Sequence, residues 1–212
     1  MIITIGRQFG SRGSEIGRMV AQQLDLPYYD KNMIDHVADK LGFSPQYVRQ
    51  VEEKPTSSFL FSMAMYSYGT PMNDGLIPAE LQVSTAQAEF IMEKAQEGKG
   101  VFVGRCADYL LKNRKDVYSV FVYADMPTRV RTVMARYNLE ERKAIRTIQQ
   151  TDKRRAAYYN TNTQHRWGAR ESYNLLLDSG VLGMEGTVAA IEYCAQIFAQ
   201  QRGIPYAGGD KA

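Results

Sequence analysis

The sequence predicts a doubly wound α/β fold, in which helices cover both faces of a parallel β-sheet. Short apolar strands alternate with helical segments along most of the chain, and this alternation is typical of parallel sheets with crossover helices. The first strand also leads directly into a glycine-rich turn and then into a helix, at the kind of sheet edge where α/β proteins bind ligands. We expect one domain over residues 1–202 and a disordered tail of small and polar residues over 203–212.

The expected strands are short runs of apolar and β-branched residues, at 2–6, 26–30, 101–103, 117–123 and 175–177. The segments between them have apolar residues at helical spacing or helix-start signals, at 14–24, 32–41, from 44 onward, 84–96, 107–112, 125–137, 139–160 and 188–198. Residues 55–78 follow neither pattern, because aromatic residues, methionines and turn signals are mixed there. We interpret this stretch as a mobile lobe with some helix, whose apolar side chains form either a small core or a base-stacking surface.

The composition of the 212-residue chain argues against several classes of protein. A formal net charge of +3 is too small to indicate nucleic-acid binding by itself. Cys106 and Cys194 lie too far apart for a metal-binding pair, and His36 and His165 leave little room for a histidine site. No apolar run reaches membrane-spanning length, and the first apolar segment is too short for a signal peptide. We therefore expect a cytoplasmic protein without a membrane partner.

Residues 6–14 have the layout of a phosphate-binding loop, in which backbone N–H groups and a helix N-terminus surround a phosphate. The common pattern is Gly, four residues, Gly, Lys and then Ser or Thr. Here Gly6 is followed at the same spacing by Ser11 and Arg12, and then by Gly13 and Ser14. The spacing is preserved while two signature residues are replaced. The alternative is a glycine-rich turn that connects a strand to a helix and binds nothing.

Each replacement in this loop has a physical consequence. Ser11 must adopt the backbone conformation of a glycine, which costs free energy if its φ is positive. Arg12 keeps the positive charge, and its planar guanidinium group either pairs with phosphate oxygens or turns away from the loop. The hydroxyl group of Ser14 lies near the position expected for a Mg²⁺ ligand. The residues expected to hold the phosphates of a nucleotide are Gly6, Gly10, Ser11, Arg12, Gly13 and Ser14.

Charged residues follow other predicted strands. Asp30 ends the second strand, Arg105 follows the third, and Asp125 follows the fourth. Because ligands bind beyond the carboxyl ends of parallel strands, Asp30 and Arg105 are candidates for contact with a substrate. The alternative for each is a cap or an ordinary surface charge.

The segment from 129 to 155 is strongly basic, with nine Lys or Arg residues against three acidic residues. Within it, Asp152, Arg155 and Tyr159 fall on one face of a helix. A charged helix is commonly just solvated, but in phosphoryl transfer a mobile arginine-rich helix neutralises the transferred group. Because the segment lacks a strong apolar stripe, we expect it to be loosely attached and to order on ligand binding. RNA or DNA binding through this helix ranks last among the functions considered.

Three segments together resemble the cytidylate kinase-like family, relatives of the nucleoside monophosphate kinases. They are residues 6–14, residues 103–108 (Val-Gly-Arg-Cys-Ala-Asp) and residues 152–160. The correspondence runs over about residues 1–200. It implies a P-loop nucleotide kinase fold with a helical lid over about 139–165 and an acceptor-binding lobe over about 31–83.

The resemblance also implies roles for individual residues. ATP and Mg²⁺ would sit on the loop, with Arg12 in the role of the usual lysine and Ser14 near the metal. Asp30 and Arg105 fall where the acceptor monophosphate is held, and Asp152 is grouped with them as substrate-binding. The lid residues that fall over the donor phosphates, and that would be catalytic together with Arg12, are Arg154 and Arg155.

The expected function is therefore ATP-dependent phosphoryl transfer to a small acceptor, most simply a nucleoside monophosphate. The rival is a nucleotide-sensing or scaffold protein that keeps the kinase fold without efficient catalysis. The replacements at Ser11 and Arg12 favour the rival, as does Cys106, which stands where cytidylate kinases have an aspartate. The residues that favour the enzyme are the retained Arg105, Asp152, Arg154 and Arg155. Either a monomer or a homodimer is compatible with the sequence.

Overall fold

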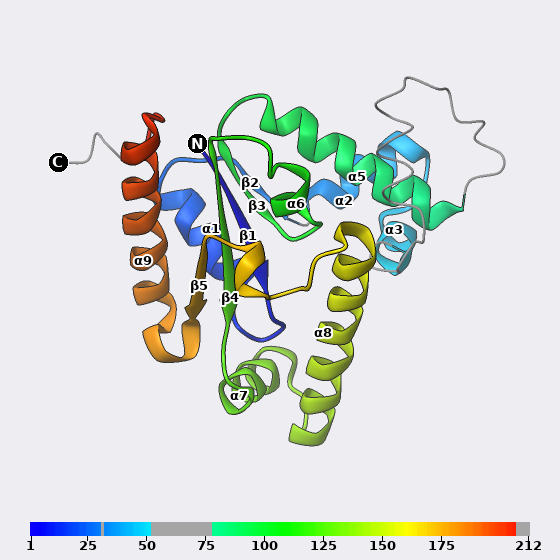
Figure 1. The fold of residues 1–212 in the computed structure, drawn as a ribbon. Coiled ribbons are helices and arrows are strands. Elements are labelled where there is room, and N and C mark those ends of the chain that lie inside the picture. The colour runs from blue at the N-terminus through cyan, green and yellow to red at the C-terminus, as the bar shows by residue number, and fades with distance from the viewer. Residues whose placement is uncertain (31, 52–77, 207–212) are drawn as a thin grey trace.

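The computed structural model describes residues 1–30, 32–51 and 78–206. They form a five-stranded sheet with the strand order β2-β3-β1-β4-β5 (Figure 1). All the pairs in it are parallel. The strands are β1 (Ile2–Arg7), β2 (Tyr28–Tyr29), β3 (Gly100–Val103), β4 (Val117–Tyr123) and β5 (Leu175–Asp178). The predicted parallel sheet is confirmed.

The helices follow the strands as expected for a doubly wound fold. They are α1 (Gly13–Gln23), α2 (Asn32–Leu41), α3 (Pro45–Val51), α5 (Ala79–Ala95), α6 (Ala107–Leu110), α7 (Met126–Tyr137), α8 (Glu141–Thr163) and α9 (Ser179–Arg202), with a short 3₁₀ helix η2 (Arg170–Ser172) before β5. Asp125 caps α7 by accepting a hydrogen bond from the Thr128 N–H group at 2.9 Å. Within the described residues, no helix is both long enough and apolar enough to span a bilayer.

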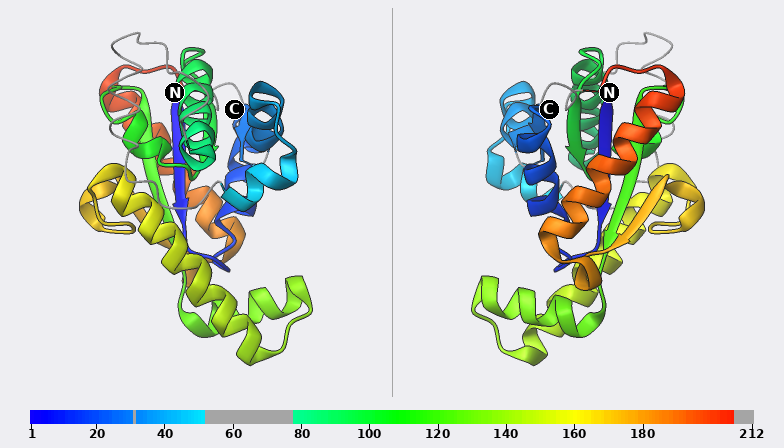
Figure 2. Two further views of the ribbon diagram at one scale, coloured as in Figure 1. Left: turned by 90° about the vertical axis from the view of Figure 1, so that its right-hand side faces the viewer. Right: turned by 90° about the vertical axis from the view of Figure 1, so that its left-hand side faces the viewer.

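The core lies on both faces of the sheet. On one face α1 and α9 pack against β1, with Ile3, Ile5 and Ile191 fully buried. On the other face α2 and α5 cover Ile2 and Phe102 (Figures 1 and 2). Because β1 is the central strand and is covered on both faces, five of its six residues are buried instead of every second one.

Helices α7 and α8 form a hairpin that extends past the carboxyl edge of the sheet (Figure 2). Ala144 and Ile148 of α8 are buried against Val130 and Val133 of α7. Further along α8, Tyr158 and Tyr159 pack in a separate aromatic cluster. The expectation that this segment lacks an apolar stripe was therefore wrong, because the stripe is interrupted by charged residues and is recognisable only once its partners are in place.

Several element boundaries differ from the prediction. β2 is shorter than expected, since Pro27 has no N–H group to donate, although its carbonyl oxygen accepts from Val101 at 2.8 Å. α9 begins at Ser179 and has a kink at Gly183, whose φ is 68°. Ile204 and Tyr206, which were assigned to the tail, pack against the core beside α9. The lobe predicted for residues 55–78 lies almost entirely outside the described residues.

Candidate phosphate-binding site

The loop between β1 and α1 is held in one conformation by its glycines. Gly10 has a φ of 84°, and a Cβ atom there would lie 2.9 Å from the Arg129 carbonyl oxygen. A Cβ atom on Gly13 would lie 2.5 Å from the Cβ of Arg7. No side chain larger than hydrogen fits at either position without displacing its neighbours. The two glycines thus allow the loop to turn tightly around the end of β1.

Ser11 is buried under the loop and serves to hold it in place. Its hydroxyl group lies 2.9 Å from the Gln8 carbonyl oxygen and 3.1 Å from that of Val122, so one hydrogen is shared between the two acceptors. The Ser11 carbonyl oxygen accepts a hydrogen bond from the Ser179 hydroxyl at 2.8 Å. Ser11 does not have a positive φ, and the left-handed residue of the loop is its neighbour Arg12, whose φ is 61°. The replacement of glycine by serine is therefore accommodated without backbone strain at that residue.

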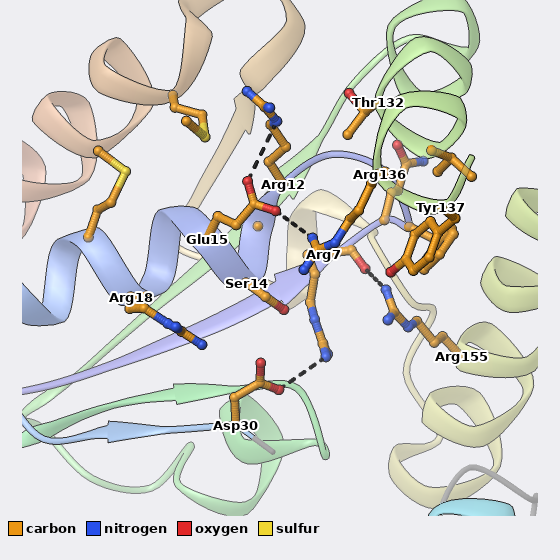
Figure 3. Close-up of a pocket in the computed structure, with 17 residues that line it drawn as sticks. Arg7, Arg12, Ser14, Glu15, Arg18, Asp30, Thr132, Arg136, Tyr137 and Arg155 are labelled. Atoms are coloured by element: carbon orange, nitrogen blue, oxygen red, sulfur yellow. Dashed lines mark hydrogen bonds and ion pairs between the residues drawn. The ribbon is translucent and has the colours of Figure 1, made fainter. Parts of the chain in front are cut away.

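Arg12 lies at the rim of the loop rather than at its centre. Its side chain is 47% exposed, and its Nε lies 3.6 Å from Glu15 Oε2. Glu15 also pairs with Arg136 from α7 (Figure 3). Of the two orientations that the sequence left open, the structure has the one in which Arg12 turns outward.

Arg7, which the sequence analysis did not single out, is the buried cation of the loop. Its side chain is 12% exposed, and its Nη2 lies 3.7 Å from Asp30 Oδ1. It crosses the end of β3 so closely that a Cβ atom on Gly104 would collide with its guanidinium group. The side chains of Arg7, Ser14 and Asp30 approach one another in Figure 3. The available signal was an arginine directly after Gly6, at the carboxyl end of a buried strand.

Asp30 is held at the sheet edge by Arg7 and by the hydroxyl group of Tyr28. The Tyr28 hydroxyl lies 3.1 Å from Asp30 Oδ2, and the same hydroxyl lies 2.8 Å from the Ser14 carbonyl oxygen. The pKa of Tyr28 is raised, mainly by burial and also by the negative charge of Asp30. Tyr28 therefore stays protonated and links the carboxylate to the start of α1.

A cavity of about 520 Å³, here called the loop cavity, opens in front of these residues. Its lining includes five arginines against two carboxylates. The arginines are Arg7, Arg12, Arg18, Arg136 and Arg155, and the acids are Glu15 and Asp30. Arg18 of α1 was missed by the sequence analysis, as were Arg136 and its neighbour Tyr137 on α7. Within the basic segment of residues 129–155, nothing in the sequence favoured Arg136 over the other basic residues. The excess of positive charge suits an anionic ligand.

Asp152 and Arg155 attach α8 to the loop. Asp152 Oδ1 accepts a hydrogen bond from the Phe9 N–H group at 2.8 Å, and its other oxygen pairs with Arg129. Arg155 Nη1 donates to the Arg7 carbonyl oxygen at 3.2 Å. Arg155 lines the loop cavity, as expected for a lid residue. Asp152 lines neither of the two cavities described here, so its contacts support the loop rather than a substrate.

A second cavity of about 570 Å³, the helix cavity, lies between α3, the loop and α8. Arg49, Arg154 and Arg155 line it, and none of the described residues in its lining carries a carboxylate. It shares Phe9, Tyr137 and Arg155 with the loop cavity. The rings of Phe9 and Tyr137 are stacked with centroids 5.8 Å apart. Arg154 thus lines a different cavity from the one that the loop forms.

The turn after β3 has an unusual backbone. Gly104, Arg105 and Cys106 are consecutive residues with positive φ, at 79°, 56° and 55°. Arg105 lies at the carboxyl end of the strand as predicted, but it is among the lining residues of neither cavity. Cys106 is buried, and burial raises the pKa of its thiol well above the usual value. Cys106 is therefore a neutral packing residue.

The half-buried carboxyl group of Asp108 lies two residues after Cys106. The Tyr159 hydroxyl of α8 donates to Asp108 Oδ2 at 2.6 Å. Burial raises the pKa of Asp108 to about 6, while the hydrogen bond from Tyr159 lowers it. Tyr173, from the segment before β5, packs beside Tyr159 with ring centroids 6.3 Å apart. None of these contacts was foreseen, because the partners are far apart in sequence.

The sheet order, the β1–α1 loop and the basic cavity at its end together define a protein with the P-loop kinase fold. A shikimate kinase from Bacteroides thetaiotaomicron has a similar structure, with a TM-score of 0.51 and 12% identity, over 92% of this chain and 98% of that one. A crystal structure of an uncharacterized protein from Eubacterium ventriosum ATCC 27560 is more similar, with a TM-score of 0.70 and 24% identity, also over 92% and 98%. At these identities the likeness establishes the fold.

The chain belongs to the cytidylate kinase-like family, whose model matches residues 2–181. The match covers the loop, the turn after β3 and all of α8, which are the segments on which the resemblance rested. A comparison with the curated proteins found no match. The family is thus kinase-like, and the fold is that of phosphotransferases.

Proposed function

We propose that the protein transfers a phosphoryl group from ATP to a small acceptor, most simply a nucleoside monophosphate. The observation that carries the proposal is the loop cavity, where five arginines face two carboxylates beside a strand–loop–helix turn. A polyphosphate supplies the negative charge that such a lining favours. Phosphoryl transfer depends mainly on positioning and on charge stabilisation, and guanidinium groups supply both.

Two arginines are best placed to act on the donor phosphates. Arg7 reaches the cavity from the end of β1 and is nearly buried, so its interaction with an anion is only weakly screened by solvent. Arg155 approaches from α8 and is attached to the same strand end through the Arg7 carbonyl oxygen. Arg12, at the rim and beside Glu15, is expected to contribute less than the family pattern implies.

The residues of the loop cavity also fit a Mg²⁺ ion. Ser14 and Asp30 both line the cavity and carry oxygen ligands. Mg²⁺ is usually bound through one or two protein ligands together with substrate phosphates, and no group of three acidic, histidine or cysteine ligands occurs among the described residues. When bound, the ion would neutralise charge on the donor phosphates, while Arg7 and Tyr28 hold the Asp30 carboxylate in place.

The acceptor has two candidate positions. The resemblance assigns its phosphate to Asp30 and Arg105, at the ends of β2 and β3. The helix cavity offers Arg49 and Arg154, and it meets the loop cavity at Arg155. We favour the helix cavity, because a guanidinium group common to both cavities would lie where the transferred group passes between two ligands.

The test is a pair of measurements on the wild type and on matched variants. Calorimetry with ADP and Mg²⁺ reports donor binding, and ADP release from ATP with CMP or UMP as the acceptor reports turnover. Arg154→Ala or Arg105→Ala should raise the KM for the acceptor without changing ADP affinity, and whichever does so identifies the acceptor site. Lys153→Ala is the control, because Lys153 is exposed beside Arg154 and lines neither cavity. Absence of ADP binding by the wild type would refute the proposal.

A nucleotide-sensing protein is the second candidate. The observation that favours it is the position of Arg12, which replaces the usual lysine and is paired with Glu15. The same assays separate the candidates. Tight ADP binding, with no ADP release across a panel of monophosphates and other phosphate or hydroxyl acceptors, would favour sensing.

A further inference from the structure

We propose that Asp108 is a positioning residue, which sets α8 and the turn after β3 against the loop through its contact with Tyr159. The proposal deepens the proposed function and rests on it only for the identity of the ligand. Asp108 lines neither the loop cavity nor the helix cavity. It therefore acts through other residues rather than by touching a nucleotide.

The first support is the contact itself. The Tyr159 hydroxyl donates to Asp108 Oδ2 at 2.6 Å, and it joins α6 to α8 across 51 positions of sequence. Tyr159 is 5% exposed, so water cannot easily substitute for either partner. A hydrogen bond to a charged group in such surroundings is stronger than one between neutral groups.

The second support is the position of Tyr159 on its helix. Arg155 lies four residues earlier, so the two side chains occupy the same face of α8, one turn apart. Arg155 lines both cavities and donates to the Arg7 carbonyl oxygen. A change in the Asp108–Tyr159 contact is therefore transmitted to the guanidinium group that lies over the loop.

The third support is the backbone on the other side of the contact. Asp108 lies two residues after Cys106 and three after Arg105, and both of these residues have positive φ. Non-glycine residues rarely adopt this conformation, and they keep it only where surrounding contacts determine it. The hydrogen bond between Tyr159 and Asp108 is one such contact. It therefore also sets the direction in which Arg105 leaves the strand.

The cluster also reaches the loop directly. Tyr173 stacks beside Tyr159. A Cβ atom on Gly6 would lie 3.0 Å from the Tyr173 hydroxyl oxygen. The start of the loop, the turn after β3 and α8 thus meet around one carboxyl group. Ionisation of that group affects all three at once.

The groups that face Asp108 determine how it titrates. They are Cys106 and Arg105 in the turn, Tyr159 on α8, and Tyr173 before β5. Burial raises the pKa of Asp108 to about 6, and the Tyr159 hydrogen bond opposes this rise. Cys106 and both tyrosines stay protonated near neutral pH, because the pKa of each is raised and burial is the largest cause of the rise. Asp108 is therefore the member of this cluster expected to change charge between pH 5 and 7.

The experiment follows ADP affinity by calorimetry from pH 5 to pH 8 in the wild type, Asp108→Asn and Tyr159→Phe. The affinity of each variant is divided by that of the wild type at the same pH. The effect of the titration of ADP itself then cancels, because it is the same for both proteins. For Asp108→Asn we expect this ratio to change by about fivefold or more across the range, the size of an ordinary coupling between sites. In Tyr159→Phe, the pH at which the affinity change is half complete should move to a higher value. The reason is that the hydrogen bond that lowers the Asp108 pKa is lost. A purely structural role would not move that midpoint.

Hydrogen exchange supplies a measurement that needs no ligand. Amides around Arg155 should exchange faster in Tyr159→Phe than in the wild type, and Tyr109→Phe is the control because Tyr109 neighbours Asp108 without this contact. Unchanged exchange in both Asp108→Asn and Tyr159→Phe, or a pH-independent affinity ratio, would overturn the proposal. Faster exchange around Arg155 with no ADP binding by the wild type would refute the proposed function and leave the positioning role supported.

Discussion

At the scale of single residues, the site depends on which arginine is buried. Arg7 and Arg12 both belong to the loop, but Arg7 is 12% exposed beside Asp30 whereas Arg12 is 47% exposed beside Glu15. Charge–charge interactions are strongly screened in water and much less so in partly buried sites. The buried arginine is therefore the one whose charge a bound phosphate would feel most.

Replacement of the two arginines should have unequal effects. Arg7→Ala should weaken ADP binding by about 1.5–3 kcal/mol, the usual contribution of a hydrogen bond to a charged group. Arg12→Ala should cost less than about 1 kcal/mol, because exposed ion pairs contribute little. Calorimetry at one salt concentration checks both, with thermal unfolding to establish that Arg7→Ala is folded. A larger loss in Arg12→Ala than in Arg7→Ala would contradict this assignment.

The Asp108 carboxyl group should also make stability depend on pH. Its pKa in the native protein is raised to about 6 from 3.8, so the native state binds this proton more tightly than the unfolded state does. Between these two values stability falls as pH rises, and above them the loss is constant. Asp108→Asn should therefore gain stability over the wild type between pH 4 and pH 7, by on the order of 2 kcal/mol.

Denaturant unfolding of the two proteins at several pH values measures this difference. The comparison is needed because Asp116 and Asp125 have a lowered pKa, and their contribution to stability is lost at lower pH in both proteins. A free-energy difference between the variant and the wild type that does not change with pH would show that Asp108 titrates normally.

At the scale of elements, α8 combines an attached part with a part whose arginines line the two cavities. Its apolar stripe packs against α7, and Asp152 links it to the loop by pairing with Arg129 and by accepting from the Phe9 N–H group. Arg154 and Arg155, directly after this anchor, line the cavities. That α8 moves as a lid and gains protection on ligand binding stays a prediction, and the greatest change is expected around these arginines.

Removal of the anchor should destabilise the whole domain. Asp152→Asn leaves Arg129, which is 7% exposed, without its charged partner. Breaking a buried ion pair by removing one partner typically costs about 3 kcal/mol or more. Urea unfolding measures this loss, with Glu141→Gln at the exposed start of α8 as the control. A stability within about 0.5 kcal/mol of the wild type would mean that Asp152 does not anchor the helix.

At the scale of the whole molecule, the order of the strands explains why distant segments share one site. β1 is central, with β3 and β4 on either side, so the loop after β1 adjoins the turn after β3 and the start of α7. Local patterns were sufficient to predict the parallel sheet and the loop, although not the strand order. Alternating strands and helices indicated the parallel sheet, and the glycine spacing from Gly6 to Gly13 indicated the loop, because both depend on neighbours in sequence.

The sequence by itself determined the doubly wound fold, the position of the loop and the family, since apolar periodicity and glycine spacing are local properties of the chain. Only the tertiary structure decided that Arg7 rather than Arg12 is buried, that Asp152 anchors the loop, and that Asp108 meets Tyr159. The physical reason is that each of these depends on a partner 23 to 148 residues away. The burial that gives such contacts their strength exists only after the sheet has formed and α8 has packed across its edge.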